Sequence, residues 1–222
     1  MAARAHSDSV ENYAKAIYAL QERHGFATTS GLAERLGVTP ASASGMVKKL
    51  DTQGLVEHIP YKGVRLTGDG ERVALEVLRH HRLLELYLAE DLGVPWDRVH
   101  DEAEVLEHVL SEELEEAISA KLGNPTRDPH GDPIPTRDGR VEQQDTLSLQ
   151  ALEPGQGGVF VRISDSDPEM LRYLSDRGIA PGDAFEVVDK QPFGGPIFAR
   201  FAEAVQVLGG DLAAAMRVEV SA

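Results

Sequence analysis

The chain has 222 residues, a formal net charge of −15 and no cysteine. This length leaves room for about two domains of ~100 residues, each large enough to bury a core. The lack of cysteine excludes disulfides, thiolate zinc sites, iron–sulfur clusters and cysteine nucleophiles, and it fits a reducing cytoplasm. No segment approaches the ~18 apolar residues of a membrane helix, and the N-terminus lacks the apolar core of a signal peptide. We therefore expect a soluble cytoplasmic protein with no membrane partner.

Charge is distributed unevenly along the chain. Residues 1–72 carry nine Lys and Arg against eight Asp and Glu, residues 73–122 carry four against thirteen, and residues 123–222 carry nine against sixteen. Because affinity for DNA depends on Lys and Arg neutralising phosphates, only the first third is expected to face nucleic acid.

The first third has the helix start and stop signals of a helix-turn-helix. Apolar residues at helical spacing predict a first helix over residues 11–21. A short helix over residues 30–36, a turn at Gly37 and a second helix that opens with Thr39 as N-cap and Pro40 as first residue follow. This order predicts a helix-turn-helix.

Two short β-type runs, LVEHI and VRLT, follow the second helix and are separated by PYKG, which predicts a hairpin. A helix-turn-helix followed by a hairpin is a winged helix-turn-helix. Its second helix would enter the major groove while the hairpin touches the phosphate backbone. The alternative is an ordinary three-helix domain with scattered surface lysines. The expected DNA contacts are Thr39, Ser42, Ser44, Lys48, Lys49, Tyr61, Lys62 and Arg65.

A long helix is predicted over residues 72–92. His81 and Glu85 lie four residues apart on it and therefore on one face. A lone pair of this kind is usually a surface hydrogen bond.

Residues 99–117 are predicted to form one strongly acidic helix. His100, Glu104 and His108 form a stripe along it, with Glu107 beside them. A solvated acidic face with incidental histidines is the ordinary interpretation. Two adjacent helices, however, each offer an imidazole and a carboxylate, and a divalent cation would neutralise the repelling carboxylates. A metal site is therefore favoured.

Oxygen and nitrogen ligands without sulfur suit Mn²⁺ or Fe²⁺, and Co²⁺, Ni²⁺ or Zn²⁺ could substitute in vitro because such ions often bind more tightly. A metal-dependent hydrolase is the competing interpretation. The zinc protease motif HExxH is absent, HxxEH fails because Glu104 stands where its first His belongs, and neither GxSxG nor a P-loop is present. We therefore expect no catalysis and no small organic cofactor.

Residues 123–150 are rich in Pro, Gly and Asp and predict a tether, in which His130 would be structural or solvent-facing rather than a metal ligand. From residue 151 onward, short alternating runs divided by Gly and Pro, with one helix over residues 167–178, predict a small barrel of about five strands.

The motifs SVENYAKAIYAL, RHHRLLE, VHDEAEVLEH and RDPHGDPIP flank the helix-turn-helix or follow it in this order. On these motifs, which span nearly all of residues 8–140, the chain resembles the diphtheria toxin repressor family of metal-activated transcriptional repressors. It looks most similar to the manganese-regulator branch that keeps a third, SH3-like domain. The resemblance implies a homodimer that is activated by Mn²⁺ and binds palindromic operators of metal-homeostasis genes.

The resemblance also implies the ligands of two metal sites. The activating site would use Asn12, Glu104, Glu107 and His108. The second site would use His81, Glu85 and His100, completed from the C-terminal domain at Asp167 or Glu169. N-capping of the following helix is the alternative for Asp167.

Two positions of the activating site bear on the choice of metal. Iron-responsive members have Cys at the position of Glu104 and Met at that of Asn12, so the oxygen ligands here favour Mn²⁺. Manganese members of the short type have Asp where Asn12 stands and Glu where Lys15 stands, so their close two-metal cluster is not implied.

The predicted architecture is mainly α with a small β domain. A winged helix-turn-helix over residues 1–72 precedes a helical dimerisation and metal-binding domain over residues 73–140, a linker over residues 141–150 and the SH3-like domain over residues 151–222. The alternatives are an Fe²⁺-activated regulator of the same family, a metal-dependent hydrolase, and an adaptor whose SH3-like domain binds peptides without metal.

Overall fold

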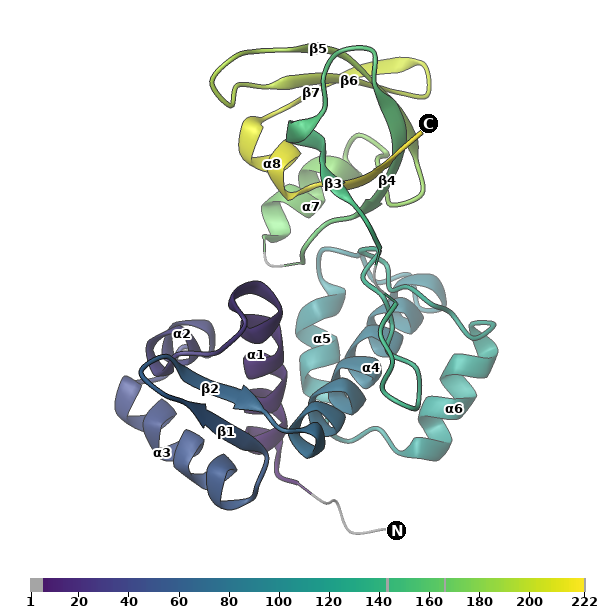
Figure 1. Ribbon diagram of the computed structural model, residues 1–222. Helices are drawn as coiled ribbons and strands as arrows, with labels where there is room; N and C mark the ends of the chain where they lie inside the picture. Colours follow the sequence, from purple (N-terminus) through teal and green to yellow (C-terminus); the bar gives the residue numbers. More distant parts are fainter. Residues whose placement is uncertain (1–5, 143, 166, 222) are drawn as a thin grey trace. The chain divides into compact units, whose positions relative to one another are not determined.

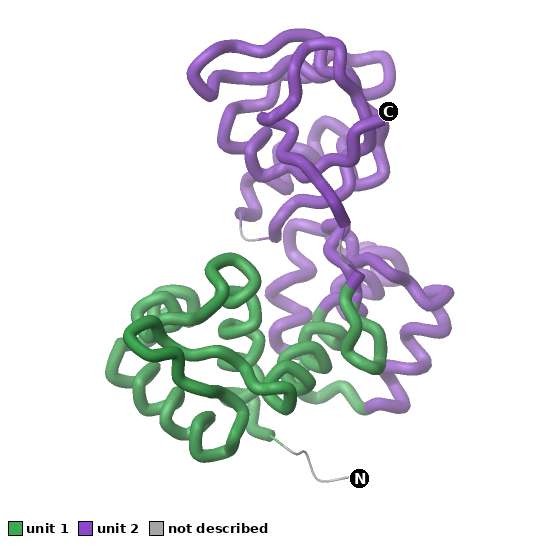
Figure 2. Tube along the Cα trace, in the orientation of Figure 1, with its two compact units in different colours: residues 1–81, 106–111, 135–141 green, residues 82–105, 112–134, 142–222 purple. Residues whose placement is uncertain are grey.

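The computed structural model describes residues 6–142, 144–165 and 167–221. Contacts within the chain divide it into two compact units (Figure 2). Unit 1 comprises residues 1–81, 106–111 and 135–141, and unit 2 comprises residues 82–105, 112–134 and 142–222. Across the described ranges, none of the helices is both long and apolar enough to cross a membrane.

Unit 1 begins with three helices (Figure 1): α1 (Asp8–His24), α2 (Thr29–Arg35) and α3 (Pro40–Thr52). The hydroxyl of Thr28 caps α2 by accepting from the amide of Gly31, and the hydroxyl of Thr39 caps α3 by accepting from that of Ser42. These caps satisfy amide groups that a helix start leaves without partners. The predicted helix-turn-helix is confirmed, although α1 extends beyond the predicted range at both ends.

The hairpin consists of β1 (Val56–Ile59) and β2 (Gly63–Leu66), paired antiparallel with Val56 opposite Leu66. It is attached to the helices by two backbone hydrogen bonds between Ala27 and Val64. Its inward side chains join the helices in one apolar core, which includes Ile17, Leu32 and Leu50 at 0% exposure. The hairpin is therefore packed into the apolar core of unit 1.

The helix α4 (Gly68–Glu90) starts in unit 1 and continues into unit 2. The single acidic helix predicted over residues 99–117 is wrong: α5 (Val99–Leu106) and α6 (Glu112–Lys121) are separated by residues 107–111. A fresh helix start at residue 112 places three glutamates in the first turn of α6, where the positive end of the helix dipole stabilises them. One continuous helix would have left them without that stabilisation.

The predicted tether is also wrong over residues 125–134. Asp128, His130 and Ile134 are buried there at 7%, 1% and 5% exposure. The carboxylate of Asp128 accepts from the amides of His130 and Asp132, which closes a tight turn. Backbone polar groups that are satisfied in this way can be buried. This segment, although rich in Pro and Gly, therefore packs against the protein instead of forming an exposed tether.

The C-terminal part of unit 2 is a β domain. Within the described residues its antiparallel sheet has the order β3-β8-β4-β5-β6-β7, where the prediction was about five strands. Phe160, Leu171 and Val187 are among the side chains of its core. The strands are β3 (Leu147–Ser148), β4 (Gly157–Arg162), β5 (Ala184–Lys190), β6 (Ile197–Phe201), β7 (Ala204–Leu208) and β8 (Arg217–Val220), and the helices are η1 (Leu149–Ala151), α7 (Pro168–Ser175) and α8 (Gly210–Ala215).

Candidate metal centre

The carboxylate of Glu107 is the centre of a buried polar cluster in unit 1. It follows the last residue of α5 and its side chain is fully buried. Lys15 Nζ lies 2.7 and 2.8 Å from its two oxygens. On α4, His81 Nδ1 lies 2.5 Å from Oε2. A buried carboxylate needs such partners, because burial without them is costly.

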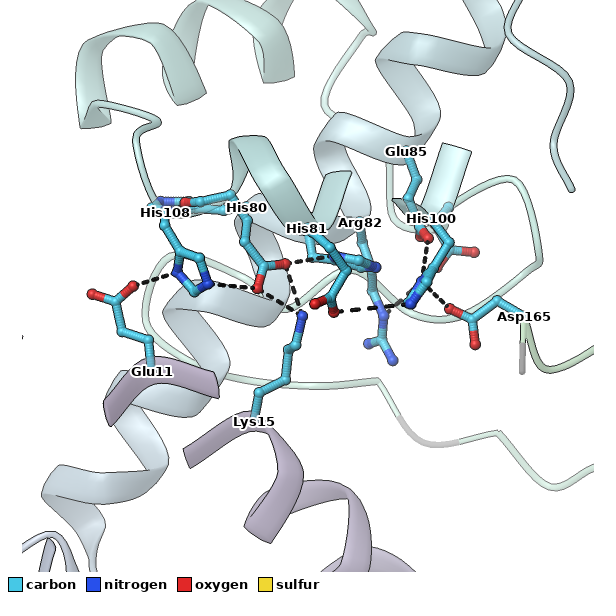
Figure 3. A network of polar contacts seen from close by, with 12 residues as sticks. Glu11, Lys15, His80, His81, Arg82, Glu85, His100, His108 and Asp165 are labelled. Atoms are coloured by element: carbon cyan, nitrogen blue, oxygen red, sulfur yellow. Dashed lines mark hydrogen bonds and ion pairs between the residues drawn. The ribbon is translucent and has the colours of Figure 1, made fainter. Parts of the chain in front are cut away.

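His108, one residue later, has two differently placed ring nitrogens. Its Nδ1 lies 2.7 Å from Oε2 of Glu11 on α1 (Figure 3). Its Nε2 is buried, lies 3.5 Å from Glu107 Oε1, and has no hydrogen-bond partner among the described residues. A histidine held by a carboxylate at one nitrogen, with the other left open, has the usual arrangement of a metal ligand.

Asn12, one residue after Glu11, offers a second atom of this kind. Its Oδ1 is buried and makes no hydrogen bond within the described part of the chain. Buried polar atoms are nearly always satisfied, so two open acceptors at predicted ligand positions call for an explanation. Asn12 Oδ1, His108 Nε2 and the Glu107 carboxylate are oxygen and nitrogen donors that fit a divalent cation.

Glu104, the fourth predicted ligand of the activating site, lies on α5 in unit 2. Its side chain is 39% exposed, and its Oε1 lies 3.9 Å from His100 Nε2. Its ligand role therefore stays a prediction.

A second cluster, in unit 2, surrounds His100. Its Nδ1 lies 2.8 Å from Asp165 and 3.4 Å from Glu85 Oε1 (Figure 3). Hydrogen bonds to Asp165 and Glu85 raise the pKa of His100 to about 10, although burial opposes the shift. Desolvation acts to raise the pKa of Asp165, but the contact with His100 holds it below its usual value. Imidazole and two carboxylates meet here, as they would around a divalent cation.

The structure places Asp165 beside His100, and not the predicted Asp167 or Glu169. Asp167 is the N-cap of α7 and accepts from the amides of Glu169 and Met170 at 3.0 and 3.3 Å. Asp167 therefore caps the helix as the alternative expects, and the ligand roles of Asp167 and Glu169 stay predictions. Glu169 lies in the first turn of α7, where the positive end of the helix dipole stabilises a carboxylate. His81, the other predicted member of this site, directs its Nδ1 to Glu107.

His130 was predicted to be structural or solvent-facing, and its 1% exposure agrees with the structural interpretation. Its ring stacks on Trp96 with centroids 5.7 Å apart, and its Nε2 lies 2.8 Å from the carbonyl oxygen of Trp96. Burial acts to lower the pKa of His130, but Glu85 and Asp128 raise it to about 9.

The predicted DNA contacts lie on the surface of unit 1. Tyr61, at the tip of the hairpin, is fully exposed and has φ +63, and Lys62 lies over the ring of Phe26 at 5.8 Å. The exposed residues at predicted contact positions are Thr39, Ser42, Ser44, Lys48 and Lys49 on or before α3, and Tyr61, Lys62 and Arg65 on the hairpin.

Three family models match the chain. The N-terminal DNA binding domain of iron dependent repressors matches residues 6–64, and their metal binding and dimerisation domain matches residues 67–136. The FeoA domain matches residues 147–220.

Individual proteins are similar over almost the whole chain. The iron-dependent repressor IdeR of Mycobacterium leprae is 32% identical, over 96% of this chain and 97% of its own. The diphtheria toxin repressor of Corynebacterium efficiens is 32% identical over 96% and 95%. A solved manganese-dependent transcriptional repressor in complex with manganese is 44% identical over 96% and 100%, with a TM-score of 0.89. These matches confirm the predicted fold class.

Proposed function

Because the chain belongs to the diphtheria toxin repressor family of metal-dependent transcriptional repressors, we propose that it is a manganese-activated homodimer that binds palindromic operators of metal-homeostasis genes. DNA binding, metal dependence and dimerisation are properties of the family. The proposal adds four points: that the activating metal is manganese, that the DNA site is a palindromic operator of metal-homeostasis genes, which residues bind the metal, and that the domain boundaries lie at residues 72, 140 and 150.

The observation that carries the proposal is a pair of buried atoms, Asn12 Oδ1 and His108 Nε2, that have no hydrogen-bond partner in the described part of the chain. Asn12 belongs to the first turns of α1, and His108 to the segment after α5. Glu11 positions His108 through Nδ1, and Glu107 supplies the charge. A divalent cation held by Asn12, Glu107 and His108, with Glu104 as the fourth proposed ligand, would neutralise Glu107 and join α1 to residues 107–108.

The donor set supports manganese. The chain has no cysteine, and the proposed ligands are carboxylate, amide and imidazole groups, which suit Mn²⁺. The 44% identical manganese-dependent repressor agrees with this choice. Fe²⁺ is the second candidate, because the same donors accept it and the 32% identical relative from Mycobacterium leprae is called iron-dependent. A second metal position is proposed at Glu85 and His100, with Asp165 in place of Asp167 or Glu169 and His81 as the remaining predicted ligand.

Binding of DNA would use the exposed face of α3 and the hairpin. Lys48 and Lys49 on α3, with Lys62 and Arg65 on the hairpin, bring positive charge to phosphates, while Ser42 and Ser44 are short enough to approach base edges. A homodimer presents two such helices, which suits a palindromic operator.

The homodimer is supported by large apolar side chains that unit 1 and unit 2 each leave in solvent. Val109 is 74% exposed in unit 1, and Val105 and Leu114 are 71% and 52% exposed in unit 2. Exposed apolar groups of this size commonly mark a protein interface.

The test is a parallel anaerobic titration of the full-length protein, stripped by chelator, with Mn²⁺ and Fe²⁺. Binding to an operator selected from random duplexes is followed by anisotropy. We expect Mn²⁺ to switch binding on at a lower free concentration than Fe²⁺. His108→Ala should remove the response, and the exposed His24→Ala should keep it. Binding without metal would refute the proposal, and a lower threshold for Fe²⁺ would reverse the choice of metal alone.

A further inference from the structure

We propose that Tyr61, at the tip of the hairpin, enters the minor groove of DNA and selects the base pairs beside each operator half-site. The inference rests on the proposed function, in which α3 and the hairpin form the DNA-binding face, and it adds a groove and a role for one side chain. It is carried by the backbone conformation of Tyr61, by its exposure and by the charge of the surrounding hairpin.

Tyr61 occupies a backbone position that ordinarily belongs to glycine or asparagine. The amide of Lys62 donates to the carbonyl oxygen of Ile59 at 3.1 Å and closes a four-residue turn. Pro60 is second in this turn and Tyr61 is third, with φ +63. Proline followed by a positive φ is the pattern of a type II turn, whose third position favours Gly or Asn. For a bulky side chain the left-handed conformation is strained.

Packing within the described part of the chain does not offset this strain, because the side chain of Tyr61 is fully exposed. The turn that carries it is nevertheless fixed. The ammonium group of Lys62 lies over the ring of Phe26, 5.8 Å from its centroid, and Ala27 and Val64 exchange two backbone hydrogen bonds. A strained and exposed aromatic side chain on a fixed support points to a partner outside the chain.

DNA is the partner that fits this position. The N-terminal DNA binding domain of iron dependent repressors matches residues 6–64, which include Tyr61. The hairpin has two basic side chains, Lys62 and Arg65, against the single acidic Glu57. Its positive charge therefore suits the phosphates on either side of a groove.

The place of the hairpin beside α3 selects the minor groove. In the chain β1 follows α3, and the two elements lie side by side in unit 1 (Figure 1). When α3 lies in the major groove, the element beside it meets the neighbouring phosphate strand, and the groove beyond that strand is the minor one. Lys62 and Arg65 suit the phosphates, whereas the flat, uncharged ring of Tyr61 suits the narrow groove.

The hydroxyl group of Tyr61 can distinguish base pairs in the minor groove. A·T pairs present only acceptors there, adenine N3 and thymine O2, while a G·C pair adds the 2-amino group of guanine. The phenol O–H donates to such an acceptor, and the 2-amino group would meet the ring. We therefore expect a preference for A·T at the base pairs that Tyr61 contacts.

The experiment compares full-length dimers by hydroxyl-radical footprinting and by anisotropy on the operator selected from random duplexes. Tyr61→Asn suits the turn, so it should raise the urea midpoint of unfolding. It should also lose protection of one minor-groove stretch beside each half-site and raise Kd at least about tenfold. Unchanged protection and unchanged Kd would overturn the proposal.

The metal condition is the one in which the wild type binds most tightly, metal-free buffer included. Failure of the proposed activation by manganese would therefore leave the comparison of Tyr61 variants intact, and the two proposals are tested separately.

Base substitution tests the groove. At the protected positions A·T is replaced by G·C or by inosine·cytosine, which has the major groove of G·C but lacks the 2-amino group in the minor groove. The wild type should bind the A·T and inosine duplexes alike and the G·C duplex at least about tenfold more weakly, whereas Tyr61→Asn should bind all three alike. A wild type that treats inosine·cytosine as G·C would place the contact in the major groove and overturn the proposal.

Two variants separate the tyrosine from strain and from charge. Phe193 is also fully exposed, with φ +60, but lies in the β domain of unit 2. Phe193→Asn should raise the urea midpoint and leave footprint and Kd unchanged. Lys62→Gln should lower the slope of log affinity against log salt by at least about 0.9 and keep the preference for A·T. Tyr61→Asn removes no charge and should keep the slope. A lowered slope in Tyr61→Asn would mean that phosphate contacts were lost instead, and would count against the proposal.

Discussion

Among single residues, Lys15 decides the electrostatic state of the Glu107 cluster. Its ammonium group contacts both oxygens of a carboxylate that is fully buried, while its own side chain is 17% exposed. In this arrangement the protein supplies its own cation to Glu107. A metal ion that uses Glu107 must therefore compete with Lys15.

We expect Lys15→Gln to separate stability from metal affinity. Removing one partner of a buried ion pair costs roughly 3 kcal/mol, so the chelator-treated variant should melt at a lower temperature. Since the competing cation is lost, Mn²⁺ should bind about tenfold more tightly, a gain of ~1.4 kcal/mol. Calorimetric titration and thermal unfolding measure both.

Lys49→Gln, on the exposed face of α3, is the matched control and should change neither quantity. An Mn²⁺ affinity in Lys15→Gln equal to or below that of the wild type would show that Lys15 supports the metal site instead of competing with it.

Glu11 acts through His108 and is expected to be a positioning residue. Glu11→Gln weakens its contact with His108 Nδ1 and should reduce Mn²⁺ affinity about 10-fold to 100-fold, as loss of an outer-shell carboxylate does. The measurement is Mn²⁺ affinity beside the melting temperature of the metal-free protein. Glu22→Gln on the exposed face of α1 is the control. If Glu11→Gln lowers the melting temperature but leaves the Mn²⁺ affinity unchanged, the role of Glu11 is purely structural.

The residues of the two clusters differ in how far they can be predicted. Glu107 and His108 are neighbours in sequence. His81 and Glu85 are one helical turn apart, so helical periodicity predicts that they lie on one face of α4. Asp165 and His130 join the cluster around Glu85 and His100 through packing between distant segments, and no local pattern carries that information. Glu11 adjoins the predicted ligand Asn12, and it was missed because a first-turn carboxylate is ordinarily a response to the helix dipole.

Among the elements, the hairpin depends on a close approach of backbones. Gly63 has φ +150, and a Cβ there would lie 2.1 Å from the carbonyl oxygen of Ala27. Gly63→Ala should therefore displace β2 from the helices and cost at least ~2 kcal/mol by denaturant unfolding.

Gly54→Ala is the matched control, because Gly54 also has positive φ, +71, but a Cβ there meets nothing within 4 Å. It should cost only the ~1 kcal/mol of a left-handed alanine. Equal losses in the two variants would mean that conformational strain, and not contact with Ala27, governs Gly63.

Elements were predictable where start and stop signals lie in the chain. Thr39 and Pro40 mark the start of α3, and the alternation in LVEHI and VRLT predicts the two strands of the hairpin. The break after α5 was missed because apolar residues keep helical spacing across it. The segment 125–134 was missed because its burial depends on Asp128 satisfying two amides, which composition cannot reveal.

For the whole molecule, we expect Val109→Glu to weaken the homodimer. Val109 is 74% exposed in one chain, and a charge placed in an apolar interface opposes association. Sedimentation equilibrium should show a dissociation constant at least about tenfold higher, with the melting transition of the monomer retained. Val188→Glu, at an exposed position of β5, should leave the association unchanged. A tight Val109→Glu dimer would place the interface elsewhere.

The whole-molecule prediction rested on motif order, and it was correct for the family and the fold class because RHHRLLE and VHDEAEVLEH combine several constraints at fixed spacing. Charge counts located the DNA-binding surface in the first third. The choice between Mn²⁺ and Fe²⁺ would depend on the geometry at the proposed ligands Asn12 and Glu104, and spacing along the chain does not encode that geometry.

The turn at residues 128–132 joins the helical part of unit 2 to its β domain through its backbone and through an ion pair between Asp132 and Arg162 at 3.2 Å. The amide of Ile163 donates to the carbonyl of His130 at 3.0 Å, and Gly131 leaves no space for a Cβ beside the carbonyl of Val161. Such a seam cannot open without exposing peptide groups on both sides. Hydrogen exchange at Ile163 should therefore be as slow as at the centre of the sheet, and it should accelerate only when the helical part and the β domain of unit 2 unfold together.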